Sequence, residues 1–258
     1  SVLWSPGVID KNTIPSFLQA DLKDKFYLVK NYGFSSVVAK QQLGKLKTIE
    51  VRENDVVVFY DGFNDFWQSS MYGNPHGTII GYNLQNRKAV MMVNFKFWLS
   101  NNLALYNLLA QIKNMNKKGT GDSRKSCTVS ENSAVKNASK FWKIYIDYLL
   151  QAKRYTEDKG AKFFHILHPN LFSYNSLTEY EKSLRKLRAC FNEAKPAYDI
   201  YYDNVSKFLK DKTWHLNLSN ELENMNLYFD HAHLVPKGNQ ILSEIILKDK
   251  NFVKLISN

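Results

Sequence analysis

The sequence is poor in the features that mark disulfide-rich, metal-binding and membrane-spanning proteins. Its 258 residues contain 2 cysteines, and the spacing of Cys127 and Cys190 fits no common metal or redox motif. We therefore expect both to be buried thiols, a state that leaves the cellular compartment open. Apolar runs of the roughly 18 residues that a membrane-spanning helix needs are absent, so no segment is expected to span a membrane.

The first residues lack the pattern of a secretory signal. The opening SVLWSPGVID has no basic start, no long apolar stretch and no small-residue cleavage site. It also lacks an initial Met. The sequence is therefore expected to begin inside a longer protein.

Acidic residues are the minority among the charged ones. There are 24 Asp and Glu against 35 Lys and Arg, which gives a formal net charge of +11. Such an excess can attract an anionic polymer or an anionic membrane surface. The lysines are scattered along the chain, however, so a solvated basic surface is the simpler interpretation, and we expect no nucleic-acid binding.

What the sequence does contain is an alternation of strand-like and helical segments. DVVVFYDGFND carries five consecutive apolar residues, 56–60, that end at Asp-Gly, which is typical of a buried parallel strand. Further strands are predicted at AKFFHILHP and TWHLN, and a short apolar run at 26–31 leads to Gly33. Helices are predicted at about 14–24, 35–47, 133–158 and 178–209 and from Pro236 onward. Pro196 is expected to break the helical stretch in which it lies. The alternation predicts one α/β domain over 1–258, a three-layer α/β/α sandwich with a mostly parallel sheet.

Residues 66–132 interrupt this alternation. An aromatic, Gly-rich stretch is followed by a polar, turn-rich one, and together they predict a surface insertion. Its Trp67, Tyr72, Tyr82 and Trp98 suit a lid or an aromatic platform over a site, and equally a small core of the insertion itself.

Several polar residues fall where the strands of such a sheet end. Reactive groups of parallel α/β sheets gather at the carboxyl ends of the strands, where Gly33, Asn64 and the segment 230–233 are predicted to lie. Asp230 and His233 have a spacing at which a carboxylate can hold an imidazole as a general base. The simpler alternative is that Asp230 caps the following helix and His233 lies on the surface.

Two other interpretations involve neighbouring residues. His231, with His165 and His168, raises the possibility of a zinc site, but no cluster of established metal spacing supports it, and no metal is expected. Asn64 and Gly33 can direct N–H groups at an anionic oxygen and so form an oxyanion hole. Taken singly, Gly33 is a turn glycine and Asn64 a loop cap.

A nucleophile is harder to find. Gly121-Asp122-Ser123 has the composition of a nucleophile motif, but Ser123 lies in a polar linker with no strand before it, so we reject it. Ser1 and Ser5 precede the first predicted helix. The last residue of a first strand would lie at this point of the chain.

The ordered blocks resemble those of the SGNH (GDSL-like) hydrolases, serine esterases of flavodoxin-like architecture. NYGFSS at 31–36 is similar to the second block, DGFND at 61–65 to the third, and DHAHL followed by PKGN to the fifth. HPNLF at 168–172 also looks like the end of strand four in some members. The resemblance covers nearly the whole chain.

The first block is the departure, because only its continuation is present. SVLWSPG is similar to the part of the pattern Gly-Gly-Ser-x-x-Trp that comes after Gly-Gly, which implies that Ser1 is the nucleophile, with Ser5 as the weaker alternative. The first strand, and any membrane anchor, would then lie upstream of the sequence.

The resemblance implies a Ser-His-Asp mechanism without a cofactor. Ser1, His233 and Asp230 would form the triad, and Ser1, Gly33 and Asn64 the oxyanion hole. The implied substrate is an ester of a small molecule or a glycan, with O-acetyl groups favoured, and the implied location is extracytoplasmic or membrane-anchored. An O-acyltransferase with the same triad and a noncatalytic basic binding module remain as alternatives.

Overall fold

The computed structural model describes residues 9–23, 27–33, 36–77, 127, 129–186 and 190–257. Within them, three strands form a parallel sheet in the order β1-β2-β3. The strands are β1 (Val56–Asp61), β2 (Lys162–Leu167) and β3 (His215–Asn217). Asp61 pairs with Leu167, the last residue of β2, so β1 and β2 end at the same edge of the sheet.

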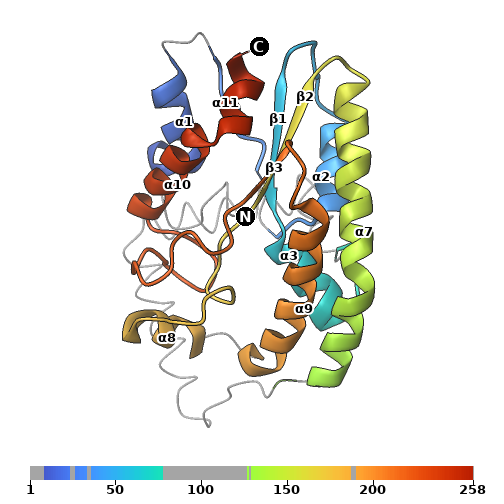
Figure 1. Ribbon diagram of the computed structural model, residues 1–258, viewed down its shortest axis with the longest axis vertical. Helices are drawn as coiled ribbons and strands as arrows, with labels where there is room; N and C mark the ends of the chain where they lie inside the picture. Colours follow the sequence, from blue (N-terminus) through green and yellow to red (C-terminus); the bar gives the residue numbers. More distant parts are fainter. Residues whose placement is uncertain are drawn as a thin grey trace, which may run out of the picture.

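Helices lie on both sides of this sheet (Figure 1). On one side are α2 (Ala39–Leu46), α7 (Glu131–Glu157) and α9 (Phe191–Leu209), and on the other α1 (Ile14–Leu22), α10 (Pro236–Lys248) and α11 (Lys250–Ser257). The remaining described helices are η1 (Asp10–Asn12), α3 (Phe63–Phe66), the π-helical turn η3 (Trp67–Met71) and α8 (Glu179–Lys186). The fold is mixed α/β.

Strand residues alternate between two hydrophobic clusters, as a period of two requires. Phe59 and Phe163 pack into the cluster that contains residues of α7 and α9. Tyr60 and Phe164 point the other way, into the cluster that contains residues of α1 and α10. Both faces of the strands are therefore buried, which explains why their sequences are nearly continuous apolar runs.

The long helix α7 shows how the sequence specifies an element. The hydroxyl of Ser130, its N-cap, accepts a hydrogen bond from the backbone N–H of Ser133 at 3.3 Å. Its buried positions include Ala138, Tyr145 and Leu149, which are one or two helical turns apart and form one apolar stripe. That stripe packs mainly against α9 and holds Tyr145 over the sheet.

The three predicted strands and most predicted helices are confirmed, but two local predictions are wrong. Residues 27–33 form no strand, so Gly33 lies in a loop and not at a strand end. Pro196 does not break its helix: it lies inside α9, and the helical stretch is interrupted earlier, at Cys190, which has a φ of 64°. The buried face of α9, with Tyr198 and Val205, compensates for the single backbone hydrogen bond that Pro removes.

The cysteines are not free thiols, which corrects a further prediction. Cys127 and Cys190 form a disulfide, with Cα atoms 4.9 Å apart. They are 63 residues apart in sequence, a separation that says nothing about their distance in space. The bond fastens residue 127 to the start of α9.

The predicted insertion is described only at its two ends. Trp67 is 6% exposed and stacks on Phe63 with ring centroids 5.9 Å apart, so it belongs to the main core. Tyr72 is exposed, and Tyr82 and Trp98 lie outside the described residues. None of the described helices combines the length and apolarity that crossing a membrane requires.

Candidate functional site

The predicted pair of Asp230 and His233 is assembled in a short loop. The loop is closed by an isolated antiparallel bridge between Tyr228 and Leu234. Nδ1 of His233 lies 2.7 Å from Oδ2 of Asp230. The other carboxylate oxygen accepts the backbone N–H groups of Ala232 and His233, both at 2.8 Å. Asp230 therefore fixes both the turn and the imidazole ring, and the alternative role of a helix cap does not apply, since Val235 is the N-cap of α10.

This geometry prepares His233 to act as a base. A proton on Nδ1, donated to the carboxylate, leaves Nε2 as the acceptor. Nε2 is buried, and no atom of the described residues forms a hydrogen bond with it. It is therefore the atom of this pair that remains available to take a proton from a nucleophile.

Electrostatics keep Asp230 ionised. Burial raises the pKa of the carboxyl, but the hydrogen bond and charge of His233, together with the N–H of Ala232, lower it more, and the pKa lies well below its usual range. An ionised Asp230 is what stabilises a protonated His233 during proton transfer.

His231 connects this loop to the ends of β1 and β2. Its ring packs 5.3 Å from the Phe63 ring and 6.4 Å from the Phe172 ring. Its backbone carbonyl accepts the N–H of Leu171 at 2.9 Å. The Asp230–His233 loop therefore lies at the carboxyl edge of the sheet, as predicted.

The two predicted oxyanion residues of the described chain have partners inside the protein. Nδ2 of Asn64 donates to the carbonyl of Val37 at 3.1 Å. The N–H of Gly33 donates to Oδ1 of Asn31 at 2.9 Å. The Asn64 amide carries a second N–H group besides the one that it donates to Val37, whereas a role at an oxyanion requires the single N–H of Gly33 to leave Asn31 or to be shared with it.

Asn64 owes its position to a glycine. Gly62 precedes α3 with a φ of 114°, and a Cβ there would come 2.5 Å from Cδ1 of Leu167. Only glycine fits this turn, which carries the chain from β1 into α3 over the end of β2.

The predicted nucleophile lies outside the described residues. This holds for Ser1, for its alternative Ser5 and for the rejected Ser123. The structure therefore brings together Asp230 and His233, places Asn64 in α3 just beyond β1 and not in a loop, and leaves the position of the nucleophile as a prediction.

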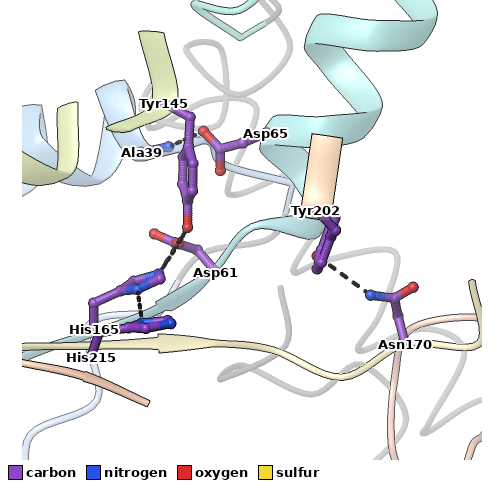
Figure 2. Close-up of polar contacts among 8 residues, drawn as sticks. All are labelled: Ala39, Asp61, Asp65, Tyr145, His165, Asn170, Tyr202 and His215. Carbon is purple, nitrogen blue, oxygen red and sulfur yellow. Dashed lines mark hydrogen bonds and ion pairs between the residues drawn. The ribbon is translucent and has the colours of Figure 1, made fainter. Parts of the chain in front are cut away.

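A buried polar network below the site was not predicted (Figure 2). The Tyr145 hydroxyl lies 2.5 Å from Oδ1 of Asp61 and 2.8 Å from Nε2 of His165. Nε2 of His165 also lies 3.1 Å from that carboxylate oxygen, and its Nδ1 lies 2.8 Å from Nδ1 of His215. All four side chains are buried, so the network holds the residue that precedes Gly62 from within the core.

Burial shifts the pKa values of His215 and Asp65, in and beside this network. Burial, with a smaller effect of neighbouring His165, lowers the pKa of His215 to about 2. Burial and then the charge of Asp61 raise the pKa of Asp65 well above its usual range, although the N–H of Ala39 donates to it. His215 is therefore neutral at ordinary pH. One signal of the network was present in the sequence, since His165 interrupts the apolar run of β2 and a second His, His215, begins β3.

Asn170 fixes the loop that follows β2. Its Nδ2 lies 3.0 Å from the Tyr198 hydroxyl and 3.4 Å from that of Tyr202, the contact drawn in Figure 2. Its Oδ1 accepts the N–H of Phe172 at 3.0 Å. The loop from His168 to Phe172 is thus held by hydrogen bonds as well as by packing.

The alternative of a zinc site gains no support from the geometry. In the part of the chain that the structure describes, no three His, Cys, Asp or Glu side chains are grouped as metal ligands. Comparisons of the chain with protein-family models, with curated proteins and with solved structures found no match.

Proposed function

We propose that this protein is a serine esterase of the SGNH type that hydrolyses carboxylic esters. The observation that carries the proposal is the Asp230–His233 pair, whose 2.7 Å hydrogen bond leaves Nε2 of His233 without a partner among the described residues. Its location at the carboxyl ends of parallel strands is where α/β enzymes hold their reactive groups. Helices on both sides of the sheet support the finer expectation of a three-layer α/β/α sandwich.

The mechanism follows from the roles of the side chains. His233 Nε2 takes the proton from the Ser1 hydroxyl while Ser1 Oγ attacks the ester carbonyl. The oxyanion is held by the N–H groups of Ser1 and Gly33 and by Nδ2 of Asn64. His233 then protonates the leaving alcohol, and water, activated by the same base, releases the acid from Ser1.

O-acyl groups on a glycan, acetyl above all, are the substrates we favour. Two exposed aromatic rings adjoin the proposed machinery: Tyr32 directly precedes Gly33, and Phe229 directly precedes Asp230. Aromatic faces suit sugar rings, whose hydroxyl groups remain in water. The disulfide supports an extracytoplasmic location, since such bonds persist in oxidising compartments.

Labelling of the full-length protein with a fluorophosphonate probe tests the proposal. We expect wild type to be labelled, Ser1→Ala to lose the label, and His233→Ala to be labelled at least about 100-fold more slowly, the usual contribution of a general base. Ser5→Ala and His231→Ala are the matched controls and should label as wild type does.

Two results would contradict the proposal. One is a folded wild-type protein that takes up no label, and the other is label that survives in Ser1→Ala. If labelling behaves as expected, release of free acetate from an acetylated sugar separates an esterase from an acyltransferase, whose turnover would require a second sugar as acceptor.

A further inference from the structure

His168 is a buried histidine that the proposed mechanism does not use. It follows β2 directly, and its backbone N–H donates to the carbonyl of Asp61 at 3.1 Å. Its ring lies 5.4 Å from the Tyr60 ring and stacks on the Phe63 ring at 6.0 Å. The side chain is thus held between residues of the end of β1 and the start of α3.

Neither nitrogen of this ring has a hydrogen-bond partner within the described part of the chain. The side chain is 0% exposed, and neither Nδ1 nor Nε2 forms a hydrogen bond with any described residue. The hydroxyl of the neighbouring Tyr60 is buried and unpartnered in the same way. Buried polar groups nearly always have partners, because an unmet one destabilises the folded state. Two such groups on adjacent rings therefore indicate a place where a bound molecule completes the hydrogen bonding.

The two groups are also uncharged. Burial, with a smaller effect of the positive charge of His233, lowers the pKa of His168 to about 3, while burial raises the pKa of Tyr60 well above its usual range. Phe63 links His168 to the loop of the base, because the His168 ring stacks on the Phe63 ring at 6.0 Å and the His231 ring packs on it at 5.3 Å. His231 lies in the same loop as His233, so His168 and the base are both held around the start of α3.

We propose that His168 and Tyr60 form a subsite for the alcohol part of the substrate, and that this part carries free hydroxyl groups, as a sugar does. A neutral imidazole offers one donor and one acceptor, and a phenol offers both. A hydroxyl matches such a set, because it is uncharged and both donates and accepts. An anionic group would meet no positive charge on these two residues. This inference rests on the proposed esterase activity, whose substrate class it narrows.

The test compares two esters of the same acid on the full-length protein. One is 4-nitrophenyl acetate, whose alcohol part has no free hydroxyl, and the other is glucose carrying a single acetyl group. Tyr60→Phe and His168→Phe remove the proposed hydrogen bonds and keep a ring in place. Tyr201→Phe, which removes a buried hydroxyl from α9, is the matched control.

A selective loss is the expected result. Each of the two variants should lower kcat/KM for acetylglucose by about tenfold, the loss that one or two hydrogen bonds give, and change the value for 4-nitrophenyl acetate by less than about threefold. Tyr201→Phe should leave the ratio of the two values unchanged. The melting temperature of His168→Phe should be no lower than that of wild type, because an unmet polar ring is replaced by an apolar one.

Other results overturn the inference. An equal loss of kcat/KM on both esters would show that the residue has a structural role. Unchanged kinetics would show that the side chain does not contact the substrate or that it binds only water. Should His168→Phe fail to fold, Tyr60→Phe, which removes a single oxygen, decides between these outcomes. A wild-type protein that cleaves neither ester would instead refute the proposed esterase function, and the subsite with it.

Discussion

Removing the disulfide is expected to lower the stability of the protein by an amount that the chain separation sets. Cys127 and Cys190 are 63 residues apart, and the loop that they close contains α7 and β2. In the chain-entropy treatment, opening a loop of this size costs about 4 kcal/mol of unfolding free energy at 25 °C. For a chain of 258 residues this corresponds to a melting temperature lower by roughly 8–16 °C.

Thermal melts followed by circular dichroism measure this effect. The full-length Cys127→Ser/Cys190→Ser variant should melt at the lower temperature, and wild type treated with a reductant should approach it. The reductant should leave the double variant unchanged, which controls for effects unrelated to this bond. Each single variant should be about as unstable as the double one, because either change opens the loop.

The reasoning would be refuted by either of two findings. The first is two free thiols per chain in the native, unreduced protein. The second is a double variant that melts with wild type, which would mean that the loop is already constrained in the unfolded ensemble.

Three further predictions concern residues near the site. Because folding lowers the pKa of Asp230, its contribution is present above the unfolded pKa of about 3.9 and is lost as pH falls through the lower folded pKa. Melting temperatures should therefore favour wild type over Asp230→Asn at pH 6 and converge toward pH 2; a constant difference would contradict this. Gly62→Ala should lower the free energy of unfolding, measured by urea titration, by about 2–4 kcal/mol, because the φ of Gly62 is positive and a Cβ would collide with Leu167. Gly44→Ala is the control: a Cβ there meets open space in α2, so this variant should raise the free energy of unfolding by about 0.5–1 kcal/mol. Tyr145→Phe removes the 2.5 Å hydrogen bond to the buried Asp61 and should lower the free energy of unfolding by about 1–3 kcal/mol in the same titration. Tyr155, on the same helix, is more exposed, so Tyr155→Phe should lower it by less than about 0.5 kcal/mol.

The sequence predicts best those features that are local. The strands β1 and β2 are predominantly apolar runs, although His165 interrupts the second, and the Asp230–His233 pair lies within one four-residue loop. In both cases the interaction that defines the feature acts between neighbours in the chain, so residue type and spacing are sufficient.

Features that join distant segments are the ones that the sequence did not predict. The contact between His165 and His215 spans 50 residues, and that between Tyr145 and Asp61 spans 84. Such pairs depend on the register of neighbouring strands and on the placement of a helix over them. Pro196 is a further example, since propensity predicts a break and tertiary packing prevents it.

The single carboxylate of Asp230 has a consequence for how the protein fails in acid. It holds the imidazole of His233 and also the amides of Ala232 and His233, so one protonation event removes the partner of the base and two bonds of the loop. Hydrogen exchange at these two amides should then become faster as Asp230 takes up its proton. Acid unfolding would in that case begin as a local and reversible opening of a few residues, while the sheet and the helices around it remain folded.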